Sequence, residues 1–89
     1  MRLKENTLAI LLRKKASAEL IFILSIDFGR NVYGKNYIAI NYSEVYGSFE
    51  KTIFFEDISY LQEAEMTEDI KKRLIQKYGR KIAKERGIK

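Results

Sequence analysis

The chain has 89 residues and a net charge of +5, and it contains no cysteine, histidine or proline. This length predicts one domain over residues 1–89, because pieces below roughly 50 residues rarely bury enough surface to fold alone. Without cysteine or histidine, disulfide bridges, Ser-His and Cys-His catalytic pairs and most zinc sites are excluded. We therefore expect no bound cofactor, no metal site and a cytoplasmic location.

Apolar segments of the chain are short. One of the two longest, of five residues each, runs from Leu20 to Leu24 and is followed by Ser25 and Asp27, far below the ~20 residues that span a bilayer. The apolar stretch near the N-terminus ends at Leu12, before three basic residues, and is too short for a signal peptide. These patterns predict a protein with no membrane partner.

Residues 19–28 have the alternation of a strand. Even-numbered residues from Leu20 to Phe28 are all apolar, and Ile21 and Ile23 occupy the opposite face. Because both faces are partly apolar, we expect this strand to be central and its even-numbered residues to share one face. Turn residues follow at 29–34, a second alternating run covers 35–43, and a turn containing Gly47 leads to a third run at 49–55.

Two segments have less distinct patterns. Residues 7–18 fit either a helix or a strand, and their composition favours the helix, since the segment KASA lacks the Gly, Asn or Asp of a tight hairpin turn. Asp57 is suited to begin a short helical segment that extends to Ala64.

A longer helix is predicted from Thr67, its N-cap, to about Glu85, with a stop at Gly87. Gly79 is expected to kink this helix or to end it early. Its buried stripe is expected to contain Ile70, Leu74, Ile75, Tyr78 and Ile82. The predicted fold class is therefore α+β: an antiparallel meander of three to four strands packed against a C-terminal helix, with the N-terminal segment either helix or strand.

Basic residues are concentrated in that helix. From Thr67 onward, nine Lys and Arg residues oppose three acidic ones, a net charge of +6, whereas residues 1–66 sum to −1. Arg73, Lys77, Arg80 and Lys84 fall within a sector about 60° wide on a continuous helix, forming a ridge about 16 Å long. This length matches several phosphates of a nucleic-acid backbone. The candidate nucleic-acid-binding residues are Lys72, Arg73, Lys77, Arg80, Lys84 and Arg86.

Other interpretations of these patterns remain open. The ridge is also what the solvated face of an amphipathic helix looks like. Exposed aromatic residues can stack on bases, and Tyr33 and Tyr46 are the best placed because they lie in predicted turns. The same aromatic residues are equally typical of strand packing.

The segment ILSIDFGRNVYG resembles the first strand and turn of the ribonuclease H-like Holliday-junction resolvases. The positions that match are Asp27, Phe28, Gly29 and Gly34. The resemblance, over 12 to 20 residues, implies that Asp27 helps to hold a divalent metal for phosphodiester hydrolysis. Such chemistry needs further carboxylates, and the chain is too short for the remaining parallel strands of that fold. The alternative is a hairpin in which Asp27 accepts hydrogen bonds from turn N–H groups.

Three classes of function follow from the sequence. The first is a small basic protein that binds DNA or RNA phosphates through its C-terminal helix. The second is a homodimer or an inhibitor-like module that contacts another protein through a sheet edge or helix. The third, with the least support, is a histidine-free ribonuclease that uses Lys, Arg and Tyr. No catalytic residue is assigned.

Overall fold

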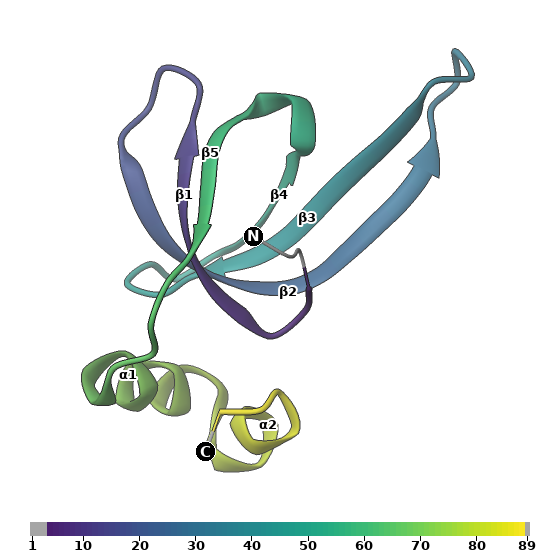
Figure 1. Ribbon diagram of the computed structural model, residues 1–89. Helices are drawn as coiled ribbons and strands as arrows, with labels where there is room; N and C mark the ends of the chain where they lie inside the picture. The colour runs from purple at the N-terminus through teal and green to yellow at the C-terminus, as the bar shows by residue number, and fades with distance from the viewer. Residues whose placement is uncertain (1–3, 89) are drawn as a thin grey trace.

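A computed structural model describes residues 4–88, which form a five-stranded antiparallel sheet and two helices (Figure 1). The sheet order is β4-β3-β2-β1-β5. The predicted α+β class is confirmed, but the sheet has five strands rather than three or four. The elements are β1 (Thr7–Arg13), β2 (Ala18–Arg30), β3 (Asn36–Glu44), β4 (Glu50–Phe54), a 3₁₀ turn η1 (Phe55–Asp57), β5 (Ile58–Glu63), α1 (Glu68–Tyr78) and α2 (Arg80–Glu85).

Strand β2 is central, as predicted, and both of its faces are buried from Ile21 to Leu24. Ile21 and Ile23 face one cluster, formed within the curled sheet, and Phe22 and Leu24 face a second cluster, formed against the helices. Burial on both faces explains the unbroken apolar run in this strand. The first cluster contains Ala9, Leu11, Ile21, Ile23, Ile40, Tyr42 and Ile53. The second contains Leu8, Phe22, Leu24, Val45, Ile70, Leu74, Ala83 and Ile88.

An irregularity in β2 changes which residues share a face. Ile23 pairs with Tyr42, but Ser25 pairs with Asn41, so Leu24 is an extra residue in the ladder. Because side chains alternate along a strand, this insertion reverses the faces of all later residues. Ile26 therefore packs in the cluster of Ile21 and Ile23, and the prediction that it shares a face with Phe22 was wrong.

The segment at 7–18 is a strand and a turn, so the preference for helix was wrong. β1 pairs with β2 from Thr7 opposite Ile23 to Leu12 opposite Ala18. In the turn between β1 and β2, Lys15 adopts the left-handed φ of 62° that glycine or asparagine more often supplies. The turn therefore forms without the usual turn residues, and the composition of the segment was misleading.

The segment after Phe55 is also a strand, contrary to the predicted short helix. Only η1 is helical, and β5 then pairs with the outer edge of β1, with Leu61 opposite Leu11. Leu61 and Ile58 pack against the cluster within the curled sheet. The strand thus owes its conformation to a partner about fifty residues away along the chain.

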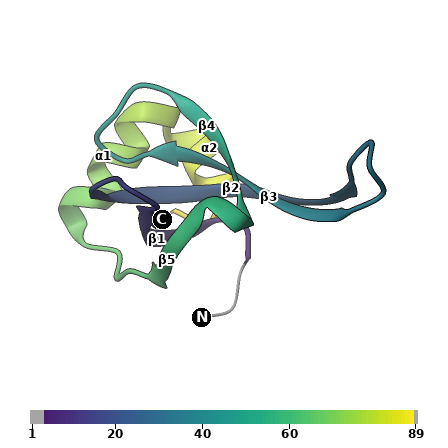
Figure 2. The ribbon, with the colours of Figure 1, turned by 90° about the horizontal axis from the view of Figure 1, so that it is seen from above.

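The β2–β3 hairpin is present as predicted and extends beyond the rest of the sheet (Figure 2). Its turn is organised by Asn31, whose Oδ1 accepts the N–H groups of Tyr33 at 2.9 Å and Lys35 at 3.1 Å. Gly34 supplies the left-handed φ of 79°. Asp27 lies within β2 and accepts from Asn41 Nδ2 at 2.7 Å, so Asn31, rather than Asp27, receives the turn N–H groups.

Helix α1 begins at the predicted cap, where Thr67 Oγ1 accepts the N–H of Ile70 at 3.3 Å. It ends at Gly79, whose φ of 83° and ψ of 158° turn the chain into α2. This turn removes Ile82 from the predicted stripe and leaves it 47% exposed, while Ala83 and Ile88 are buried instead. Gly87 follows α2 at a φ of 81° and is the expected stop. Within residues 4–88, no helix has the length and apolar character needed to cross a bilayer.

Candidate nucleic-acid interface

The four residues of the predicted ridge, Arg73, Lys77, Arg80 and Lys84, do not lie on one continuous helix. Because Gly79 ends α1, Arg73 and Lys77 lie on one helix axis, and Arg80 and Lys84 lie on another. The arrangement predicted for a single helix is therefore wrong. The structure separates the candidates into two groups that differ in what their side chains contact.

Arg73, Lys77 and Arg86 contact the backbone of the sheet. Lys77 Nζ donates to the carbonyl oxygens of Glu44 at 2.6 Å and Gly47 at 2.8 Å, and Arg73 Nε donates to that of Val45 at 3.2 Å. These bonds hold the β3–β4 turn against α1. Arg86 donates to the carbonyl of Leu24 at 3.4 Å, which joins the end of α2 to β2.

The surroundings of Lys77 stabilise its ammonium charge less than water does. Burial lowers the pKa of Lys77 below its ordinary value of 10.5, and the neighbouring positive charge of Arg73 lowers it further. The carboxylates of Glu44 and Glu50 oppose this effect only in part. Together with its two carbonyl contacts, the lowered pKa indicates that Lys77 has a structural role.

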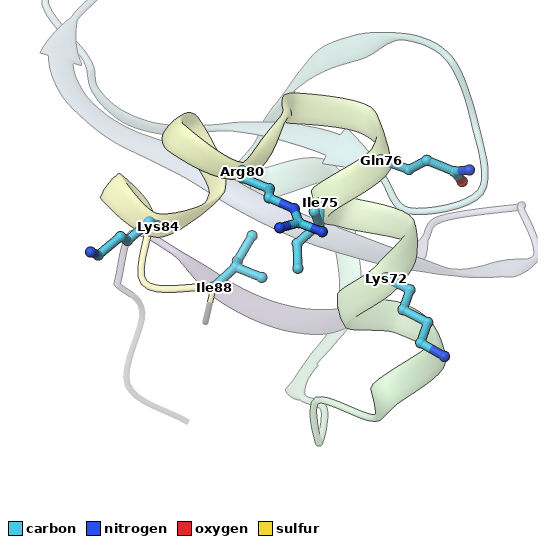
Figure 3. A pocket seen from close by; sticks show the side chains of 6 residues that line it. All are labelled: Lys72, Ile75, Gln76, Arg80, Lys84 and Ile88. Atoms are coloured by element: carbon cyan, nitrogen blue, oxygen red, sulfur yellow. The ribbon is translucent and has the colours of Figure 1, made fainter.

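Lys72, Arg80 and Lys84 line one open groove between α1 and α2, which also includes Ile75, Gln76 and Ile88. Figure 3 shows Arg80 extending over Ile75, with Lys72 and Lys84 at opposite ends. All three basic side chains are exposed. The groove thus has an apolar floor and a basic rim, and this combination was missed from the sequence. The signal that could have revealed it is the pair of glycines, Gly79 and Gly87, which fold the segment back on itself.

No side-chain carboxylate of residues 4–88 forms an ion pair with this basic rim. Within residues 4–88, the ion pairs join Arg13 to Glu19 and Lys51 to Glu44, and both lie in the sheet. The net positive charge of the helices is therefore not cancelled by internal pairing. A cluster of this kind attracts polyanions through its summed field.

The aromatic residues considered for stacking differ in exposure. Tyr33 is 85% exposed and Tyr46 is 65% exposed, whereas Tyr42 is fully buried and serves the core. Tyr33 lies in the turn of the projecting hairpin, and Tyr46 in the turn held by Arg73 and Lys77. Both of the preferred residues are therefore accessible.

The surroundings of Asp27 do not match those expected from the resolvase resemblance. Its strand belongs to a sheet whose pairings are all antiparallel. Nowhere in residues 4–88 do three or more acidic residues gather to hold a metal ion. The side chain is instead part of a polar group in which Asn41 donates to both Asp27 and Ser25.

The chain matches no family model, no curated protein and no solved structure with which it was compared. Its function must therefore be argued from its own residues.

Proposed function

We propose that this protein binds nucleic acid by contacting backbone phosphates with Lys72, Arg80 and Lys84. The observation that carries the proposal is that these three residues, from two helices, line the rim of one groove. Arg73, Lys77 and Arg86 already donate to oxygens of the protein, so they support the helices rather than the ligand.

Contacts of this kind predict little sequence preference. Contacts from lysine and arginine to phosphates carry no information about base sequence. Such contacts release counterions bound to the nucleic acid, so the affinity falls as the salt concentration rises. Each neutralised phosphate contributes about 0.7–0.9 to the slope of log K against log salt. Three contacts should therefore account for a slope of roughly 2–3 units.

The test is fluorescence anisotropy with labelled single-stranded RNA, single-stranded DNA and duplex DNA over a range of salt. The variant Lys72→Gln/Arg80→Gln/Lys84→Gln should lose roughly 2–3 units of slope. A matched control removes three exposed lysines of the β1–β2 and β2–β3 turns, Lys14, Lys15 and Lys35, and should change the slope much less. Gel analysis of the same strands reports whether they are cleaved.

Two results would contradict the proposal. One is failure of the wild-type protein to bind any of the three probes at low salt. The other is an equal loss of slope in the two triple variants, which would mean that binding depends on net charge alone and not on the groove.

A further inference from the structure

Among residues 4–88, the outer half of β2 has no pairing partner along one edge. β1 pairs with β2 only as far as Ile23, where Asn6 N–H also donates to the Ile23 carbonyl at 2.7 Å. No other strand of residues 4–88 pairs with β2 beyond this point on that side. The projecting part of the hairpin, visible in Figure 2, is therefore a two-stranded ribbon. Such ribbons are marginally stable alone, and their open edges can pair with another strand.

Hydrogen bonding in the turn indicates which residues face this edge. Asn31 N–H donates to the Lys35 carbonyl at 2.9 Å, and bonded pairs recur at every second residue of an antiparallel ladder. The backbone N–H and carbonyl groups of Ser25, Asp27 and Gly29 therefore point toward β3. The N–H and carbonyl groups that point to the open edge belong to Ile26, Phe28 and Arg30.

We propose that a second copy of this chain pairs with this edge, antiparallel, about a two-fold axis at Phe28. Phe28 then lies opposite the partner's Phe28, and Ile26 lies opposite the partner's Arg30. Three outward residues on each chain give about six backbone hydrogen bonds. The two sheets become one continuous sheet of the dimer.

The side chains of this register are compatible on both faces. The Phe28 ring is 75% exposed in one chain and gains the partner's Phe28 as a cross-strand aromatic neighbour. Arg30 lies beside an apolar residue, and Asp27 lies opposite the partner's Gly29, so no like charges are directly opposed. Tyr37 covers Gly29 so closely that a Cβ there would approach its ring to 2.5 Å, which keeps this position free of a side chain.

The length of the open edge also fits a second hairpin. In this register the partner's Val32 reaches the level of Leu24, one residue beyond the last β1 pair at Ile23. The partner's hairpin therefore fills the edge without displacing β1. Pairing centred on Ile26 or Arg30 would leave outward groups of the edge without partners.

The test measures mass by light scattering over roughly a hundredfold range of protein concentration. Wild-type protein should approach twice the chain mass of 10.5 kDa. Phe28→Lys and Phe28→Glu should each remain monomeric, whereas an equal mixture of the two should associate, because residue 28 meets residue 28 only in this register. Phe49→Lys is the matched control, since Phe49 is 71% exposed in the β3–β4 turn, outside this register, and it should associate like the wild type.

Cross-linking tests the same register independently of affinity. The chain has no cysteine, so Phe28→Cys can form only one disulfide, between two copies, across a Cα separation of about 5.5 Å. Phe28→Cys should cross-link on mild oxidation and Val32→Cys should not. A monomeric wild type at every concentration would overturn the proposal, and so would a dimer that forms equally well in Phe28→Lys.

Discussion

Replacement of Leu74 by alanine tests whether the helices belong to the core. Leu74 is fully buried in the cluster that joins α1 to β2. Truncation of a buried leucine costs about 2–5 kcal/mol, because the removed atoms lose their contacts and leave a cavity. In a domain of this size, 1 kcal/mol shifts the melting temperature by about 4–8 °C. Leu74→Ala should therefore melt at least about 8 °C below the wild type.

Ile82→Ala is the matched control for this experiment. The sequence places Ile82 on the same apolar stripe, yet it is nearly half exposed, so its truncation should cost less than about 1 kcal/mol. Arg80→Gln should also melt like the wild type. Urea and thermal unfolding followed by circular dichroism measure all three variants. If Leu74→Ala were as stable as the wild type, or if Ile82→Ala lost as much stability, the packing described for the helices would be wrong.

Further predictions concern the turns and a buried hydroxyl. Gly79→Ala should lose about 1–2 kcal/mol in urea unfolding, because Gly79 has a φ of 83°; unchanged stability would mean that the chain does not need this turn. Asn31→Ala should speed hydrogen exchange of the Tyr33 and Lys35 amides, measured by NMR, because Asn31 Oδ1 accepts both; unchanged exchange would contradict this role. Burial raises the pKa of Tyr78 above its ordinary value of 10.0. As pH rises, the unfolded chain therefore loses the phenolic proton before the folded protein does. The free energy of unfolding should consequently fall as pH rises past about 10. Urea unfolding at several pH values should show a smaller fall for Tyr78→Phe, and equal falls would refute this assignment.

The central part of the fold could be predicted because its signals are local. The alternation in β2, the turn residues around Gly34 and the cap at Thr67 all act within a few residues of the structure that they specify. β1 and β5 could not be assigned in this way. β5 pairs with β1, about fifty residues away along the chain, as between Leu61 and Leu11, and a single sequence does not reveal such a distant partner. β1 also pairs with its neighbour β2, but the turn between them lacks the usual turn residues.

The candidate site was predicted in part. The concentration of basic residues near the C-terminus was evident from charge alone, but their grouping depended on Gly79. A continuous helix would place Lys77 and Arg80 side by side, whereas the turn at Gly79 directs Lys77 to backbone carbonyls and Arg80 to the groove. The bulge at Leu24 had a similar effect on β2, since one extra residue exchanged the faces of the strand.

The most direct test of the proposed function is an NMR titration of the ¹⁵N-labelled protein with a short single-stranded oligonucleotide. We predict that the largest amide shift changes will be grouped around Lys72, Arg80, Lys84 and Ile88, and that they will disappear when salt is added. Amides of the turn at Lys14 and Lys15 should change little. Shift changes centred on that turn, or spread evenly over all exposed lysines, would contradict the assignment of the α1–α2 groove as the nucleic-acid interface.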